Sequence, residues 1–220
     1  MYTQSEENYI KAIYALGGHT HEAISTNLLA AKLQTKPSSV TDMLKKLTDK
    51  EIVSYTKYQG CVLTEKGKKI ALSIIRKHRL WEVFLVEKLN FGWEEVHEIA
   101  EQLEHIQSSN LTDKLDEFLN FPDFDPHGDP IPTANGDYRI NQKRTLLSNC
   151  SEGQAGIIMG VEDGQIDFLQ YLNQIKLRIG SKIEVKSILQ FDQSMQIQLD
   201  GQLHQFSQIV ASKIAIKLEK

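Results

Sequence analysis

Histidine and glutamate side chains in the middle of the chain have the types and spacing of a metal site. At 100° per residue, a helix predicted over 93–107 places four of them within an arc of about 100°, opposite the apolar residues. These four are His97, Glu101, Glu104 and His105. Carboxylates and imidazoles so arranged suit one or two divalent ions, and a cation would cancel the repulsion among the carboxylates.

A helix predicted over 64–89 carries a second pair of this kind. His78 and Glu82 are four residues apart, so they lie on one helical face. A solvated acidic face, or a structural His–Glu hydrogen bond, would explain either helix alone. Two neighbouring helices that both present His and Glu instead favour a shared cation. The absence of thiolates from the set favours Mn²⁺ or Fe²⁺, and Zn²⁺ or Co²⁺ could substitute in vitro.

The N-terminal segments have the order of a winged helix-turn-helix. Apolar spacing predicts three helices followed by a β-hairpin. In chain order these are 4–16, a short helix from Ser25, 37–50, and strands over 52–56 and 61–63. Residues 32–69 hold nine lysines and four acidic residues, although the whole chain has a formal charge of −4. Such a local basic block is typical of a DNA-binding surface.

The third predicted helix would be the recognition helix, whose N-terminal residues meet base edges in the major groove. Its hydroxyl groups suit bases or phosphates, whereas lysines farther along and near the hairpin tip suit phosphates. The predicted DNA-contacting residues are Lys36, Pro37, Ser38, Ser39, Thr41, Lys45, Lys46 and Lys57. The alternative is a helical domain whose lysines only keep it soluble.

The rest of the chain and its composition set the fold class. Residues 121–137 contain four of the five prolines, which predicts an extended linker. From Leu146 onward, short β-like runs alternate with turns, as in a small β-barrel. We therefore predict a mainly α fold with a small β part.

No apolar run approaches ~18 residues, so no membrane span is expected. Two distant cysteines and no secretory signal favour the reducing cytoplasm.

Several stretches resemble the diphtheria-toxin-repressor family of metal-dependent transcriptional regulators, which includes iron- and manganese-dependent members. The most specific pattern is RKHRL followed by VHEIAEQLEH. Other matching stretches are ENYIKAIYAL, KPSSVTDMLKKL, GCVLTEKGKKIA and DPHGDPIP. The resemblance covers essentially the whole chain, including a C-terminal part similar to the family's SH3-like, FeoA-like domain.

The resemblance implies a three-part architecture and a regulatory role. The implied parts are a winged helix-turn-helix over 1–63, a helical dimerisation and metal-binding domain over 64–142, and an SH3-like β-barrel over 143–220. The implied protein is a homodimer that binds double-stranded palindromic operator DNA with metal as corepressor and controls metal-uptake genes. We expect the dimer to form through apolar faces of 70–120, around Trp81, Phe84 and Leu85.

The resemblance also implies two metal sites. His78, Glu101, Glu104 and His105 match the principal site, and Asn8 stands where the family has a ligand on its first helix, usually Asp or Met. The implied second site comprises Glu82, His97, Asp125, His127 and Asp167. Lys11 replaces a further acid found in many manganese members, and Glu7 is expected to point elsewhere. Glu101 stands where iron-responsive members tend to have Cys, which favours Mn²⁺ over Fe²⁺.

Other functions stay open on the residues alone. A metalloenzyme could use the same ligands, but no convincing nucleophile or phosphate-binding glycine loop accompanies them, so we predict no enzyme. A winged-helix regulator that senses an organic ligand without metal is a second alternative. A metal buffer that does not bind DNA is a third.

Overall fold

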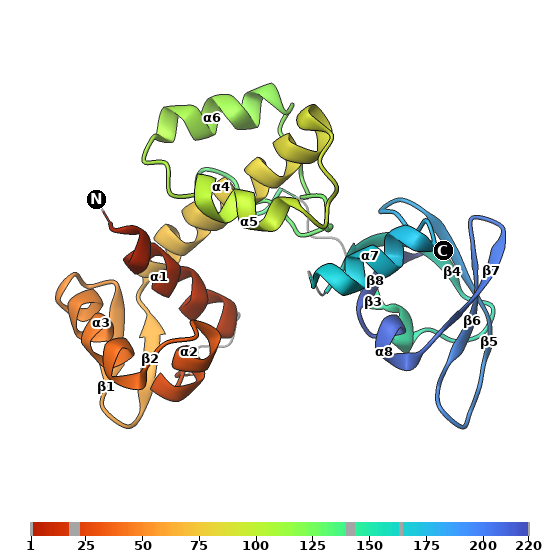
Figure 1. Ribbon diagram of the computed structural model, residues 1–220, viewed down its shortest axis with the longest axis horizontal. Coiled ribbons are helices and arrows are strands. Elements are labelled where there is room, and N and C mark those ends of the chain that lie inside the picture. Colours follow the sequence, from red (N-terminus) through yellow and green to blue (C-terminus); the bar gives the residue numbers. More distant parts are fainter. Residues whose placement is uncertain (1, 18–22, 140–143, 163–164, 220) are drawn as a thin grey trace. The chain divides into compact units, whose positions relative to one another are not determined.

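The computed structural model describes residues 2–17, 23–139, 144–162 and 165–219 (Figure 1). The chain divides into two compact units, each of which draws on three stretches of sequence. The first comprises 1–78, 101–115 and 132–137, and the second comprises 79–100, 116–131 and 138–220. The predicted boundary between residues 142 and 143 lies outside the described residues.

The first unit contains the winged helix-turn-helix. Its elements are α1 (Gln4–Gly17), α2 (Thr26–Lys32), α3 (Pro37–Asp49), β1 (Val53–Thr56) and β2 (Gly60–Leu63). Ser25 caps α2, since its hydroxyl accepts a hydrogen bond from the Leu28 N–H at 3.2 Å. Pro37 begins α3, where its fixed φ suits the first helical turn. The strands pair antiparallel, so the predicted order of helices and hairpin is confirmed.

Apolar side chains from all three helices form the core of this winged helix. Ile10 and Ile13 from α1, Leu29 from α2, and Leu44 and Leu47 from α3 are each at most 1% exposed. Because α1 buries these side chains against α2 and α3, its position is fixed relative to the recognition helix. The polar side chains on the rest of α1 are free to serve a different contact.

Three further helices are α4 (Glu65–Leu89), α5 (Val96–Leu103) and α6 (Ser109–Phe118). The second of these is shorter than the helix predicted over 93–107. It ends at Leu103, so Glu104 and His105 lie in a turn. The expectation that they share one helical arc with His97 and Glu101 is therefore wrong. The apolar period continues to Ile106, and periodicity alone could not locate the end of the helix.

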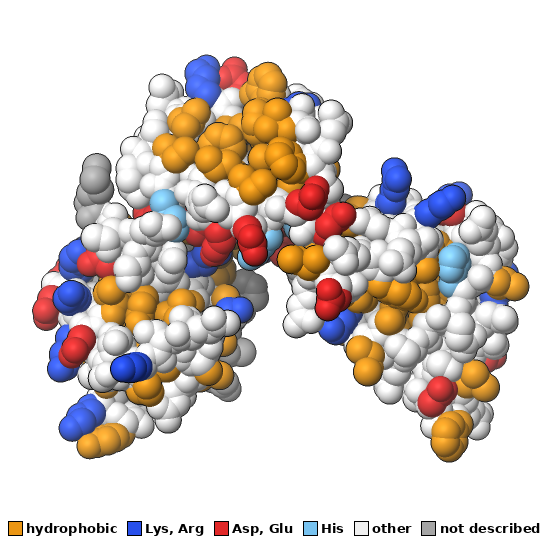
Figure 2. Space-filling model, viewed as in Figure 1, with side chains coloured by type: hydrophobic (Ala, Val, Ile, Leu, Met, Phe, Trp, Pro, Cys, Tyr) orange, Lys and Arg blue, Asp and Glu red, His pale blue; other side chains and the backbone are white. Residues whose placement is uncertain are grey.

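An aromatic cluster in the second unit connects α4 to α6. The rings of Trp81 and Phe84 lie 5.7 Å apart, and those of Phe84 and Phe118 lie 6.2 Å apart. Phe118 is 63% exposed, and Figure 2 shows a patch of hydrophobic side chains on this helical part of the chain. Leu85 is only 3% exposed, so the expectation that it belongs to a dimer surface is corrected: it packs inside.

The C-terminal part of the second unit is a six-stranded antiparallel sheet. Its strands are β3 (Thr145–Leu146), β4 (Ala155–Val161), β5 (Lys182–Ile188), β6 (Met195–Leu199), β7 (Gln202–Phe206) and β8 (Ile214–Leu218). Their order is β3-β8-β4-β5-β6-β7. The predicted β-domain is thus confirmed, and because the pairings described leave β3 and β7 at the edges, closure into a barrel stays a prediction.

Three short helical segments complete the β-domain: η1 (Leu147–Asn149), α7 (Ile166–Gln174) and α8 (Gln208–Ala211). Leu169 and Leu172 from α7 are at most 1% exposed and pack in the same core as Val185, Ile197 and Phe206 from the strands. Within the part of the chain that the structure describes, no helix is long and apolar enough to span a bilayer.

Candidate metal centres and DNA surface

A cluster of polar side chains in the first unit joins α1, α4 and the turn after α5. Glu104 is at its centre, and its fully buried side chain places Oε2 2.6 Å from His78 Nδ1. In the same cluster, His105 Nδ1 lies 2.6 Å from Glu7 Oε2. Residues far apart in the sequence thus meet around α1, the first helix of the winged-helix domain.

The ammonium of Lys11 lies among the predicted ligands of this cluster. Lys11 Nζ is 2.6 Å from Glu104 Oε2, 3.1 Å from Glu101 Oε1 and 3.2 Å from His78 Nδ1. Burial alone would raise the pKa of Glu104, but the hydrogen bond from His78 and the charge of Lys11 outweigh burial and hold that pKa below its ordinary value. Glu104 is therefore an ionised carboxylate in a buried setting.

Two buried oxygen atoms, one on α1 and one in the cluster, have no hydrogen-bond partner among the residues described. They are Asn8 Oδ1 and Glu104 Oε1. Buried polar atoms are nearly always paired, so both oxygens are suited to ligate an added group. The carboxylates of Glu101 and Glu104 and the imidazole of His78, which meet at Lys11 Nζ, are donor types that Mn²⁺ or Fe²⁺ accepts. The residues present therefore fit a divalent cation.

Glu7 contacts this cluster, although sequence reasoning did not count it among the site residues. Its carboxylate is buried, with Oε2 against His105 and Oε1 accepting a hydrogen bond from Gln107 Nε2 at 2.7 Å. The expectation that Glu7 points elsewhere is therefore wrong. Glu7 orients the imidazole of His105, which is how carboxylates hold histidine ligands in metal sites. A pattern on α1 alone could not reveal this, because the partner comes from a distant turn.

A second cluster lies within the second unit. Glu82 on α4 meets Asp125 and His127 from the proline-rich segment, with ligand atoms within 4.8 Å of one another. His127 Nε2 donates to the carbonyl of Trp93 at 2.9 Å, and the two rings stack with centroids 5.8 Å apart. His127 Nδ1 then faces Glu82 Oε2 at 3.7 Å. The backbone contact thus fixes the ring with Nδ1 toward the carboxylates.

Burial and neighbouring charges set the protonation of this second cluster. Burial, with the charges of Glu82 and Asp129, raises the pKa of Asp125 to about 7, although Arg79 opposes the shift. Burial alone would lower the pKa of His127, but the facing carboxylates of Glu82 and Asp125 raise it to about 9. Protonated His127 and Arg79 therefore balance the carboxylates when no metal is bound.

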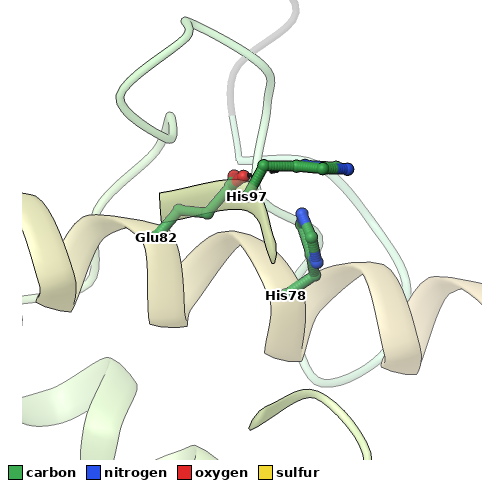
Figure 3. Close-up of side chains that lie close together, drawn as sticks. All are labelled: His78, Glu82 and His97. Atoms are coloured by element: carbon green, nitrogen blue, oxygen red, sulfur yellow. Dashed lines mark hydrogen bonds and ion pairs between the residues drawn. The ribbon is translucent and has the colours of Figure 1, made fainter. Parts of the chain in front are cut away.

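Of two further predicted ligands, His97 lies beside the second cluster and Asp167 does not. His97 Nδ1 lies 3.4 Å from Glu82 Oε1, with its side chain 61% exposed. Figure 3 shows His97 extending beside Glu82, with His78 and Glu82 projecting from the same side of α4. Asp167 is exposed in the first turn of α7 and lies outside the group that Glu82 forms with Asp125 and His127. The structure does not bring Asp167 to this cluster.

The predicted DNA-contacting residues lie on the surface of the winged helix. Those that are exposed are Lys36, Pro37, Ser38, Ser39, Lys45, Lys46 and Lys57. Thr41 is half-buried, and its hydroxyl donates to the Pro37 carbonyl at 3.0 Å. Tyr58 near the hairpin turn, which the sequence analysis did not single out, is 93% exposed and lies with its ring centroid 4.9 Å from Lys57 Nζ.

Family models match three consecutive parts of the chain. Residues 1–61 match the N-terminal DNA-binding domain of iron-dependent repressors. Residues 64–133 match the metal-binding and dimerisation domain of the same repressors. Residues 145–218 match the FeoA domain. These three matches have the same order as the three parts that the resemblance implied.

Individual relatives agree with the family models. The chain is 38% identical over 121 residues to the HTH-type transcriptional regulator MntR of Oceanobacillus iheyensis, which covers 55% of this chain and 81% of that protein. A solved manganese-dependent transcriptional repressor in complex with manganese is 30% identical, with a TM-score of 0.88 over 97% of this chain and 100% of the other. The manganese regulator SloR is 36% identical, with a TM-score of 0.75 over 97% and 98% of the two chains. The chain therefore belongs to the diphtheria-toxin-repressor (DtxR/MntR) family of metal-activated, DNA-binding transcriptional repressors, in the group with a C-terminal FeoA domain.

Proposed function

We propose that this repressor is a cytoplasmic homodimer, activated by Mn²⁺, that binds a palindromic operator and controls metal-uptake genes. The observation that carries the proposal is the cluster around Glu104. It joins α1 of the DNA-binding domain to His78 and His105 of the matched metal-binding domain. Occupation of this cluster by a cation would therefore affect how α1 is held.

The proposed ligands form two sites. Asn8, His78, Glu101, Glu104 and His105 would hold the principal ion, and Glu7 would orient His105. Glu82, His97, Asp125 and His127 would hold the second. Asp167 is left out because it is exposed and outside the cluster. When bound, the cation supplies the positive charge that these buried carboxylates require.

The donor set favours manganese over iron. The principal cluster offers carboxylate, amide and imidazole ligands and no thiolate, which suits a hard cation. Glu101 stands where iron-responsive members tend to have Cys. Two of the relatives described above are named as manganese-dependent repressors or regulators. Fe²⁺ is the alternative activator, and Zn²⁺ or Co²⁺ would substitute in vitro.

The proposed switch acts through α1. With the cluster held by a cation, α1 is fixed to His78 and the turn after α5, and the population shifts to one placement of the winged helix. In a dimer, that placement sets the distance between two recognition helices, which must match half-sites about one DNA turn, or a multiple, apart. Operator DNA must in return tighten metal binding, because coupling is reciprocal.

We propose domain boundaries at 1–63, 64–142 and 143–220, and no catalytic role. The family consists of transcriptional regulators, and the clusters described contain buried carboxylates already paired with histidine or lysine. Activity toward generic phosphoesters in the presence of Mn²⁺ would contradict the non-catalytic assignment.

The test is a titration of DNA selected from a random pool by the Mn²⁺-loaded protein. We expect anaerobic Mn²⁺ to raise the affinity for that DNA by about ten- to hundred-fold over protein in chelator. The double variant Glu101→Ala/His105→Ala should stay folded and lose this response. Glu98→Ala, an exposed change on the helix that carries Glu101, is the matched control. Equal affinity with and without metal would refute the proposal.

A further inference from the structure

Lys11 has an unusual place for a lysine. Its side chain is only 19% exposed and reaches the interior of the principal cluster. Lys11 Nζ donates to Glu104 Oε2 at 2.6 Å and to Glu101 Oε1 at 3.1 Å, and it lies 3.2 Å from His78 Nδ1. The Lys11 ammonium thus lies at the point where the carboxylates and the imidazole converge.

The cluster needs a positive charge in both the metal-free and the metal-bound protein. Glu104 is fully buried and Glu101 is partly buried, and their carboxylates share the same Lys11 ammonium. Two carboxylates facing one point repel each other strongly when they are shielded from water. Removal of the ammonium without a replacement would leave Glu104 as an uncompensated buried charge, which is strongly destabilising.

A metal ion and this ammonium cannot use the same oxygen atoms at once. The atoms closest to Lys11 Nζ are those that the proposed site would offer to a cation, whereas Asn8 Oδ1 and Glu104 Oε1 lack a partner among the residues described. From this geometry we infer that Lys11 is a tethered cation that occupies the principal site in the metal-free protein and must be displaced when metal binds. This inference rests on the proposed metal site.

Metal binding at this site is an exchange of one cation, the Lys11 ammonium, for another. The metal-free state is not a set of carboxylates in mutual repulsion, because the Lys11 ammonium already pairs with both Glu101 and Glu104. The measured metal affinity is then set by the free energy of binding the metal less the free energy of displacing the Lys11 ammonium from the same ligands. Lys11 therefore sets the metal concentration at which the repressor responds, and its replacement shifts that threshold.

The test compares four variants with the full-length wild-type protein. Mn²⁺ affinity is measured anaerobically against a fluorescent competing chelator, with Glu101→Ala/His105→Ala to identify binding outside the principal site. We expect Lys11→Met to bind Mn²⁺ about ten-fold more tightly, and its metal-free melting temperature to fall by about 3 °C or more. Lys11→Arg, which keeps the charge, should retain wild-type affinity. Lys68→Met, which removes a surface pair with Glu65, should change neither quantity.

Each result decides a specific point. Equal or weaker Mn²⁺ affinity of Lys11→Met, an unchanged metal-free melting temperature, or a tighter affinity of Lys11→Arg would overturn the inference and leave the metal site intact. If neither the wild type nor any Lys11 variant binds Mn²⁺ better than Glu101→Ala/His105→Ala, the proposed function fails instead. Lys11→Gln replaces Lys11→Met if the latter does not fold.

Discussion

At the scale of single residues, Glu104 determines whether the principal cluster exists. Its side chain is fully buried and contacts both His78 and Lys11 within 2.6 Å. Both partners reach it from other elements, so Glu104 connects α1 to α4. Loss of its charge would leave Lys11 and His78 without their common acceptor.

We expect Glu104→Gln to lower the free energy of unfolding of metal-free protein by about 3 kcal/mol, because it removes one partner of a buried ion pair. It should also weaken Mn²⁺ binding by about hundred-fold or more, because loss of a proposed direct ligand should cost at least as much as loss of an outer-shell partner. Urea unfolding and chelator competition measure the two effects. Glu98→Gln on exposed α5 surface should change neither. Wild-type stability of Glu104→Gln would show that the ion pair is dispensable.

The second cluster predicts a pH dependence of the metal-free protein. The pKa of His127 is raised to about 9 and that of Asp125 to about 7, so folding favours the protonated form of both. Stability from His127 is complete below its unfolded pKa of about 6.5 and is lost as pH rises through about 9. The charged groups that act on His127 are Glu82 and Asp125, and Asp129 and Arg79 act in turn on Asp125.

We therefore expect the melting temperature in chelator to fall between about pH 6.5 and 9. His127→Gln should flatten this fall, because a neutral amide replaces the titrating ring. His204→Gln, a half-buried histidine of the β-domain, is the control and should keep the wild-type slope. An unchanged slope in His127→Gln would assign the pH dependence to other groups.

At the scale of secondary structure elements, amphipathic periodicity predicted the long helices and the hairpin well. α1, α3 and α4 begin and end within two residues of their predicted limits. The end of α5 was not predictable, because apolar spacing continues past Leu103 to Ile106 while the chain leaves the helix. Short elements such as β3 and α8 were missed, since two to four residues show no period.

The candidate metal site was predictable in part. The types and helical spacing of His78, Glu82, His97 and Glu101 pointed to it, because these positions depend on one helix at a time. The roles of Glu7 and Lys11 were not predictable, because each depends on which residue from a distant turn lies opposite α1. His127 needed the backbone carbonyl of Trp93 to fix its ring, and no sequence pattern encodes that contact.

Lys46 on α3, the predicted recognition helix, leads to a prediction about the salt dependence of DNA binding. Lys46 is exposed in the last turn of α3, where a lysine suits a phosphate rather than a base. Lys46→Ala should weaken binding to operator and non-operator DNA alike and reduce the slope of log affinity against log salt by about 1. Fluorescence anisotropy at several salt concentrations measures the slope. Lys182→Ala in the β-domain should leave it unchanged, and an unaltered slope in Lys46→Ala would remove Lys46 from the DNA surface.

At the scale of the whole molecule, the aromatic patch of α4 and α6 is the candidate surface for a second copy. Phe118 is 63% exposed and contacts Phe84, which in turn contacts Trp81. A contiguous apolar patch of this kind is typical of an interface. The match to a metal-binding and dimerisation domain over residues 64–133 includes all three aromatic residues.

We expect Phe118→Glu to convert the protein from dimer to monomer in analytical ultracentrifugation, because it places a charge in an apolar interface. Its Mn²⁺ affinity should stay close to wild type, since Phe118 is not a proposed ligand. Phe191→Glu is the matched control, because Phe191 is 99% exposed in the β-domain. A dimeric Phe118→Glu protein would place the interface on another surface.

The two sides of α1 have a mechanical consequence. One side is anchored by Ile10 and Ile13 in the same hydrophobic core as Leu44 and Leu47 of α3, and the other carries the polar residues that meet Glu104 and His105. A pull on the polar side cannot bend the recognition helix without opening that core. We therefore expect metal binding at α1 to move the winged helix as a rigid body, with α1 and α3 displaced together.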